Sequence, residues 1–320
     1  MAPITARGNK IMTTHTPKLS LGPILYYWDR ETLFDFYEKV AETDIDIVYL
    51  GETVCSKRRI MRDKDWLEIA IKLKNSGKEV VLSTLTLIEA NSELGKLKSI
   101  CKNEEYTIEA NDMAAVNLLS GKQTFVTGPA INIYNARTLN MLSKQGLRRW
   151  VFPVELSRET LTDILEQRPD NVETEVFVYG RLPLAFSARC FTARYHNLQK
   201  DDCQLRCIED PDGLLMSTRE EDPFLVINGI QTQSAKSCNL IADLDDMKKM
   251  GVDILRISPQ SKDTIDIINI YHDCLHGKKP IHEASSELEA LSPTSTCNGY
   301  WHGGAGMESV NQHLNEKSVE

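Results

Sequence analysis

The sequence predicts an α/β fold, a (β/α) TIM-like barrel with a cysteine-bearing insertion late in the barrel. Short β-rich runs alternate with helical apolar patterns along most of the 320 residues. The strand starts recur roughly every 20 to 30 residues, which favours a barrel over an open doubly wound sheet, the alternative that periodicity leaves open. The pattern breaks once, between Leu182 and Pro223, and this segment carries three of the eight cysteines.

The first strand and helix follow from the apolar spacing. Residues 21–28 form a β-rich apolar run. The helix after it places Leu33, Phe36, Tyr37 and Val40 at i, i+3, i+4 and i+7, the spacing of one helical face.

The second strand is predicted at residues 45–51, again an apolar run. The next helix is expected to begin at Asp65 as its N-cap, because Glu68 stands three residues later as in a capping box. Gly77 should end that helix.

The later elements repeat this alternation. Ser157 is a predicted helix N-cap. Further strands are predicted at 79–85, 106–108, 124–127, 149–154, 173–179, 224–228 and 252–257, and further helices at 88–101, 112–120, 135–145, 157–167, 239–250 and 263–276.

The chain should therefore consist of one barrel-like domain with short ends. Residues 282–295 are rich in Ser and Glu and are expected to be a mobile connector. Tyr300 and Trp301 should dock the tail onto the domain. The predicted organisation is a disordered leader at 1–18, the barrel at 19–281 with its insertion at 182–222, a connector and docking tail at 282–306, and a disordered tail at 307–320.

Composition narrows the functional class. Hydrophobic residues make up 41% and charged residues 26% of the chain, as in soluble globular proteins. A net charge of −9 argues against a nucleic-acid partner. We find no apolar run of about 18 to 20 residues and no apolar signal-peptide core, so the expected location is the cytoplasm, without a membrane span.

Disulfides are rare in the cytoplasm, so the cysteines need another explanation. Cys101, Cys238 and Cys274 stand alone in periodic apolar segments and are expected to be small buried side chains.

The other pattern is that of metal ligands. Cys190, Cys203 and Cys207 have the form C-x12-C-x3-C, and Cys55 stands four residues after Gly51, where the second strand should end. The carboxyl ends of barrel strands share one face, so these four cysteines can converge. Four thiolates suit an iron–sulfur cluster or structural zinc, and the lack of C-x-x-C pairs slightly favours iron; the alternative is that the four are scattered structural cysteines.

Six cations lie near these cysteines in the sequence and could offset the charge of such a cluster, or simply form a solvated basic face: Lys57, Arg58, Arg59, Arg189, Arg194 and Arg206. Other chemistries lack their motifs, because the chain has no phosphate-binding G-x-x-x-x-G-K-[ST], no H-E-x-x-H and no G-x-S-x-G. This points to redox chemistry or to a site that a partner completes.

Specific motifs accompany the cysteines and extend over most of the chain. They are LSLGPILYYW at 19–28, VYLGETVCSKRR at 48–59, GRLPLAFSARCFTAR at 180–194, SPQ at 258–260 and CNGYW at 297–301. With them the chain resembles the collagenase-like peptidase family, and within it the ubiquinone-biosynthesis members, over about residues 19–306.

The resemblance implies a [4Fe-4S] cluster held by Cys55, Cys190, Cys203 and Cys207. It implies a heterodimer with a UbiU-like homologous iron–sulfur protein, required for O2-independent hydroxylation of a quinone precursor in ubiquinone biosynthesis. A small UbiT-like lipid-binding protein acts in the same pathway. Peptidase activity is not implied. The alternatives are a peptidase-family hydrolase with a structural zinc site, and a cluster-bearing scaffold whose catalytic groups lie on the partner.

The wider family's signature region matches Glu175, Phe177, Gly180, Ser187 and Cys190. Glu175 alternates with apolar residues along a strand, so it is the candidate catalytic residue, facing the barrel interior; a structural salt bridge is the alternative.

Asn132 and Asn135 follow a strand end, where they would bind substrate or cap a helix, with capping favoured for Asn135. Cys297 lies in a specific motif but is not assigned to the cluster.

Overall fold

The computed structural model describes residues 16–310. Eight parallel strands close into a barrel, because β11 pairs with both β7 and β1. In register, Leu255 lies between Leu19 and Val176. The strands are β1 (Lys18–Leu21), β2 (Ile47–Leu50), β3 (Glu79–Ser83), β4 (Thr107–Ala110), β5 (Phe125–Thr127), β6 (Leu147–Val151), β7 (Glu173–Phe186) and β11 (Ile254–Ile257). The predicted TIM-like barrel is thus confirmed.

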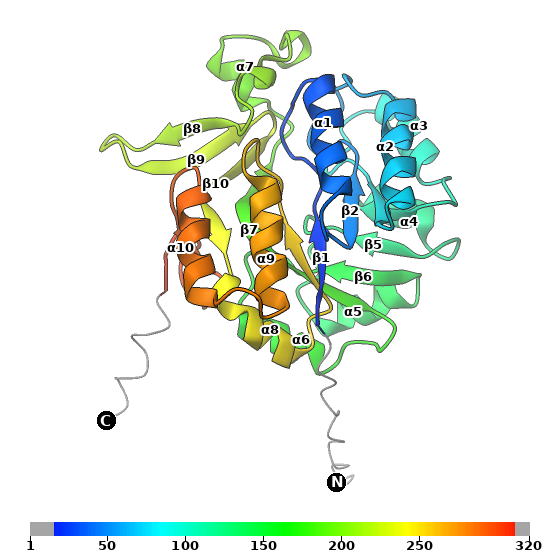
Figure 1. The fold of residues 1–320 in the computed structure, drawn as a ribbon. Helices are drawn as coiled ribbons and strands as arrows, with labels where there is room; N and C mark the ends of the chain where they lie inside the picture. The colour runs from blue at the N-terminus through cyan, green and yellow to red at the C-terminus, as the bar shows by residue number, and fades with distance from the viewer. Residues whose placement is uncertain (1–15, 311–320) are drawn as a thin grey trace, which may run out of the picture.

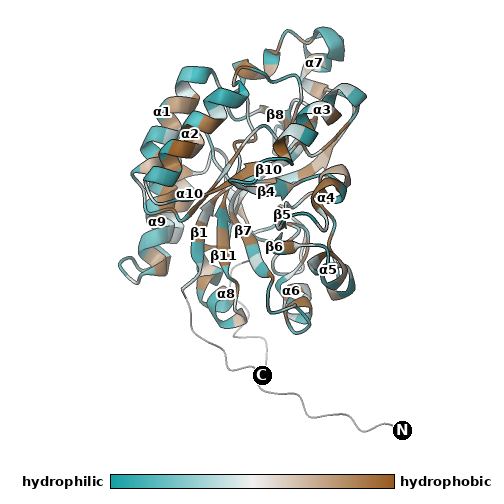
Figure 2. Ribbon diagram, turned by 90° about the vertical axis from the view of Figure 1, so that its right-hand side faces the viewer, coloured by the Kyte–Doolittle hydropathy of each residue, from teal (hydrophilic) through white to brown (hydrophobic). Residues whose placement is uncertain are grey.

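Helices surround the barrel and cover the outer face of its sheet (Figure 1). In Figure 2 their solvent side is largely hydrophilic, as expected of amphipathic helices. They are α1 (Arg30–Ala41), α2 (Asp63–Asn75), α3 (Asn91–Ile100), α4 (Met113–Leu119), α5 (Ala136–Ser143), α6 (Arg158–Leu165), α8 (Leu244–Met250), α9 (Thr264–Leu275) and α10 (Ile281–Leu291). None of the described helices has the length and apolar character needed to cross a bilayer.

The insertion begins where β7 runs on past the barrel. β7 pairs there with β10 (Gln231–Asn239), which pairs with β9 (Pro223–Asn228), and β9 pairs with β8 (Leu214–Ser217), all antiparallel. Between β7 and β8 lie α7 (Phe191–Tyr195) and the 3-10 turns η1 (Lys200–Asp202) and η2 (Arg206–Glu209). Figure 1 shows α7 and the β8–β9 ribbon projecting from one end of the barrel.

Several predicted boundaries were wrong, for local reasons. The first strand ends at Leu21, not Trp28. Gly22 donates the next ladder hydrogen bond to the Ile257 carbonyl (2.8 Å), and Pro23, without an N–H, cannot extend it. Asp65 is not an N-cap: α2 begins at Asp63, and Asp65 accepts a hydrogen bond from the Arg62 N–H (2.8 Å).

Two segments near the C-terminus also differ from the prediction. β10 runs to Asn239, so the helix predicted at 239–250 begins only at Leu244. Much of the expected connector is helical instead, because Ala284 and Leu288 place a buried stripe along α10. Trp301 is buried in the core cluster. The predicted leader lies almost wholly outside the described residues, as do the last ten residues of the predicted tail.

Candidate functional site

The four predicted ligand cysteines lie in the loops at one mouth of the barrel. Cys55 follows β2, Cys190 is the N-cap of α7, Cys203 ends η1, and Cys207 lies in η2. All four are partly exposed free thiols. The remaining cysteines lie elsewhere: Cys238, Cys274 and Cys297 are buried, and Cys101 is half-buried.

A small apolar cluster joins two of these loops. Leu25, Val54 and Ile230 form its buried centre, and Cys55 and Cys190 pack against it. The contact brings together a loop after β2 and a loop that follows β7, which are distant in sequence but adjacent at the mouth. The convergence of these two cysteines that the barrel predicted is therefore present.

Beside the cysteines, Arg58 links its own loop to the loop after β1 and to the end of β9. Its guanidinium is buried, donates to the Leu25 carbonyl (2.8 Å) and to Asn228 Oδ1 (2.6 Å), and lies 3.7 Å from Glu52. Its Nε has no hydrogen-bond partner among the described residues. A buried guanidinium with a spare donor suits an anionic group at this position.

The same cation lies beside Cys207. Burial raises the pKa of the Cys207 thiol, and Arg58 opposes this by favouring the thiolate, while Cys190 and Glu52 add to the increase. The pKa of Cys55 rises to about 11 for the same main reason, burial, with Arg58 again opposing and Cys190 contributing. Cys190 thus lies within electrostatic reach of both Cys55 and Cys207.

Lys57 brings the fourth cysteine into the same region. Its ammonium donates to the Lys200 carbonyl and to Asp201 Oδ1, both at 2.6 Å. Burial opposes its charge, yet its pKa is raised, because Asp201 and, after it, Cys203 and Cys55 favour the ammonium. Of the six predicted cations, Lys57 and Arg58 therefore act on the cysteine site.

The donor set fits an iron–sulfur cluster. The Arg58 guanidinium acts on Cys55 and Cys207, and the Lys57 ammonium acts on Cys55 and Cys203, so both cations can balance the negative charge of thiolates. Within residues 16–310, no group of three or more His, Cys, Asp and Glu side chains is arranged so that it could hold a metal ion. A cluster attaches each thiolate to a different iron, so its ligands stand farther apart than those of one ion.

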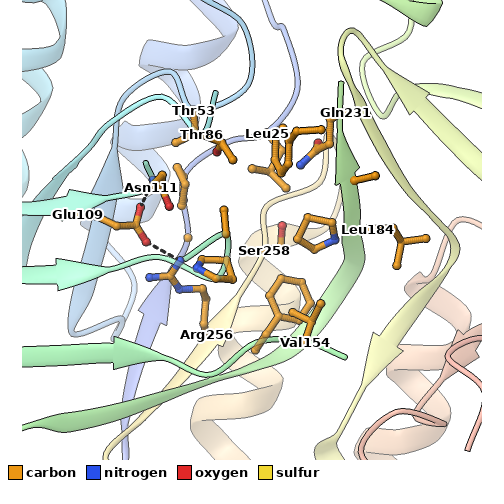
Figure 3. Close-up of a pocket in the computed structure, with 18 of the residues that line it drawn as sticks. Leu25, Thr53, Thr86, Glu109, Asn111, Val154, Leu184, Gln231, Arg256 and Ser258 are labelled. Atoms are coloured by element: carbon orange, nitrogen blue, oxygen red, sulfur yellow. Dashed lines mark hydrogen bonds and ion pairs between the residues drawn. The ribbon is translucent and has the colours of Figure 1, made fainter. Parts of the chain in front are cut away.

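A cavity of about 290 Å³ opens at the same mouth, beside the cysteine site. Leu25 and Phe186 line the cavity and also belong to the apolar cluster against which Cys55 and Cys190 pack. These two side chains therefore form the wall between cavity and thiols. Figure 3 shows the cavity with Arg256 and Glu109 on one side and Gln231 on the other.

The polar part of the cavity is built on an ion pair. Arg256 donates to Glu109 Oε1 (2.8 Å) and, from Nε, to Glu175 Oε1 (2.7 Å). Arg256 Nη2 and Gln231 Nε2 have no hydrogen-bond partner among the described residues, although both side chains are buried. Asn132 also lines the cavity, whereas Asn135 caps α5, as predicted, by accepting from the Thr138 N–H (2.9 Å). The cavity therefore offers free donors to a polar ligand.

Glu175 faces the barrel interior, as expected, but it does not line the cavity. It is fully buried and accepts hydrogen bonds from Ser20 and Tyr49 (both 2.5 Å) in addition to Arg256. Its place beneath Arg256 supports the salt-bridge alternative, in which Glu175 orients the arginine that reaches the cavity.

We expect the stability of the protein to decrease in acid because of Glu175. Burial alone would raise its pKa, but Arg256 and Arg149 outweigh burial and hold the pKa below its usual value. A lowered folded-state pKa contributes stability that is present above the unfolded value of about 4.3 and is lost as pH falls through the folded value. Urea unfolding between pH 7 and pH 3 measures this.

The matching variant is Glu175→Gln, whose stability deficit relative to wild type should shrink as the pH falls below about 4. The unfolded wild-type chain is protonated at this carboxyl first, and the folded carboxylate follows only when the pH passes its lowered pKa. Glu159→Gln on the exposed side of α6 serves as control and should follow the wild-type profile. A constant deficit at every pH would contradict this assignment.

Sequence reasoning missed Glu109 and Arg256. Both stand in short strands of otherwise apolar residues, TIEA at 107–110 and ILRI at 254–257. That signal, a charge in a buried strand, is the one that singled out Glu175, and it was available for these two as well.

The comparison with protein families places the chain among known proteins. The model described as peptidase family U32 matches residues 33–311. This match agrees at family level with the resemblance to the collagenase-like peptidase family.

Two similar proteins carry the name tRNA hydroxylation protein P. The one from Helicobacter pylori is 28% identical over 255 residues, covering 69% of this chain and 57% of the relative. The one from Escherichia coli is 38% identical over 76 residues, covering 24% of this chain and 16% of the relative. The chain therefore spans little more than half the length of the first and a small part of the second.

Among solved structures, one described as the U32 peptidase Mk0906 aligns with 81% of this chain and 97% of its own, at 13% identity and a TM-score of 0.44.

Proposed function

This chain belongs to peptidase family U32, and from that premise we propose that it is a UbiV-type iron–sulfur subunit of an O2-independent hydroxylase in ubiquinone biosynthesis. Its partner is a UbiU-like homologue, and a UbiT-like lipid-binding protein acts in the same pathway. The observation that carries the proposal is the gathering of Cys55, Cys190, Cys203 and Cys207 around Arg58 and Lys57. Relatives named for hydroxylation support the reaction type.

A [4Fe-4S] cluster bound to these cysteines would supply one-electron chemistry at the barrel mouth. The chain's own residues would prepare the site. Arg58 offsets the negative charge of the thiolates, and Leu25 with Phe186 forms an apolar wall between thiols and cavity. Arg256 and Gln231 offer free hydrogen-bond donors, which can orient a polar substituent on an aromatic ring.

The hydroxylation of tRNA is the second candidate, because the relatives carry that name. The net charge of −9 weighs against it, since a tRNA-binding surface should be basic. The hydrolase alternative with structural zinc rests on the family's description alone and has no motif for a nucleophile or a catalytic zinc.

The decisive experiment incubates the chain and its co-expressed UbiU-like partner, purified without oxygen, with a quinone precursor, unmodified tRNA or a peptide mixture in parallel. We expect ring hydroxylation of the quinone precursor in the absence of O2, detected by mass spectrometry, and none with Cys207→Ser. Hydroxylated tRNA would instead establish the second candidate. Peptide cleavage that survives Cys207→Ser would overturn both.

A further inference from the structure

The insertion exposes an unusual amount of apolar surface. Seven of the twelve large hydrophobic side chains that are exposed in the described part of the chain lie between residues 184 and 224. They are Leu184, Phe191, Tyr195, Ile208, Leu215, Met216 and Phe224. Leu184 also lines the cavity, whereas the other six side chains line neither the cavity nor the barrel core. A patch of this kind on a folded protein marks a site of protein–protein contact.

The centre of this surface is an unpaired strand edge. β8 is the last strand of the sheet path, and within residues 16–310 it pairs only with β9. Its sequence, LLMS, holds no charge and no proline. Natural sheets usually protect an exposed edge with lysine, proline or a bulge, because its free N–H and C=O groups otherwise recruit another strand. In β8 the register shifts only at the end of the strand, between Met216 and Ser217.

Both faces of the ribbon are apolar at this edge. Leu215 and Met216 are neighbours in β8, so they point to opposite faces, and they are 44% and 42% exposed. Phe224 on β9 is 44% exposed. A strand added beside β8 would cover the edge and contact apolar side chains on either face.

The charges around the edge decide what kind of chain can bind. The ribbon tip after β8 carries Glu220, Glu221 and Asp222 against one cation, Arg219, all exposed. If two copies of this chain paired their β8 strands around a two-fold axis, each tip would lie beside residues 209–213 of the other copy.

That stretch holds further acids, Glu209 and Asp210 among them, and Arg206 already pairs with Glu209 (2.9 Å). Like charges would therefore meet twice across the axis, which disfavours self-association.

We propose that the β8 edge binds a strand of a second, different protein chain that places basic side chains beside the acidic ribbon tip. The proposal deepens the proposed function, on which it rests for the partner's identity: the UbiU-like homologue. Ile208, 40% exposed, is the sequence neighbour of Cys207, so a chain bound along β8 could also contact the cysteine site. The partner would thereby cover both the strand edge and the cluster.

The test measures the affinity of the co-expressed, anaerobically purified UbiU-like homologue for the full chain by calorimetry, with iron content recorded for each variant. Leu215→Lys/Met216→Lys changes the edge, and Glu220→Lys/Glu221→Lys reverses the tip charge. Both pairs are exposed, so the fold tolerates them. We expect each double variant to lose at least about tenfold in affinity with unchanged iron content, and the tip variant to lose salt dependence.

Matched controls carry the same chemistry on the far flanks of the barrel. Met141→Lys replaces an apolar side chain that is 50% exposed on α5, and Asp163→Lys/Glu166→Lys reverses two exposed acids on α6. Both should bind as wild type does. Wild-type affinity for the partner in the two ribbon variants would overturn the inference. It would also be overturned if the wild-type chain formed a homodimer or bound tRNA and only the ribbon variants lost that interaction.

If no preparation of the chain contained iron, the proposed function would be contradicted. The affinities of the variants would still show whether the β8 edge binds the partner.

Discussion

Replacing Cys190 by serine is expected to abolish cluster binding. The wild-type chain, purified without oxygen, should hold about four irons and four sulfides, and each of the variants Cys55→Ser, Cys190→Ser, Cys203→Ser and Cys207→Ser should hold close to none. The physical reason is that each thiolate binds its own iron, and a serine hydroxyl is a poor ligand for it. Iron and sulfide analysis, with visible and EPR spectra, measures the effect.

Cys101→Ser is the matched control, because Cys101 is also a partly exposed free thiol but lies after α3, away from the mouth. It should keep the full cluster. The ligand variants should also keep the circular dichroism of the barrel, because the cysteine loops lie outside the main hydrophobic core. Full iron content in two or more ligand variants, or zinc alone in the wild type, would contradict the assignment.

Replacing Glu175 by leucine is expected to destabilise the barrel by about 3–5 kcal/mol, the usual cost of removing one member of a buried ion pair. Glu175 is fully buried, and its removal leaves Arg256 with one carboxylate, Glu109, and removes the acceptor of Ser20 and Tyr49. Urea unfolding at pH 7 measures the loss in the free energy of unfolding.

Glu173→Leu is the control, since Glu173 also pairs with an arginine, Arg149 at 2.8 Å, but has a side chain that is 41% exposed. Glu173→Leu should lower the free energy of unfolding by no more than about 1 kcal/mol. The double variant Glu175→Leu/Arg256→Met should not recover the loss, because it leaves the buried Glu109 carboxylate without its cation. Equal costs for Glu175→Leu and Glu173→Leu would show that the buried pair does not stabilise the fold.

Much of the barrel was predictable because its strands and helices carry strong local signals. Apolar runs bounded by Gly or Asp predicted β2, and the spacing of Leu33, Tyr37 and Val40 predicted α1. The strands of the insertion were harder. β8 was not predicted, and neither was β10, QTQSAKSCN, because it is mostly polar although most of its residues are buried.

The cysteine site shows the same division. Spacing and the position after a strand end were enough to select Cys55, Cys190, Cys203 and Cys207 from the sequence. Glu52 was not selected, although it accepts hydrogen bonds from the N–H groups of Val54 and Cys55 (2.9 and 3.0 Å), because its role depends on the fold of its own loop.

The sequence by itself determined the barrel class, the four cysteine candidates and the interior position of Glu175, since each depends on local periodicity or on the order of elements along the chain. Only the tertiary structure decided that Arg58 lies beside the cysteines, that Arg256 rather than Glu175 reaches the cavity, and that β8 has a free edge. The physical reason is that these features depend on contacts between segments far apart in sequence. Those segments come together only when the barrel closes.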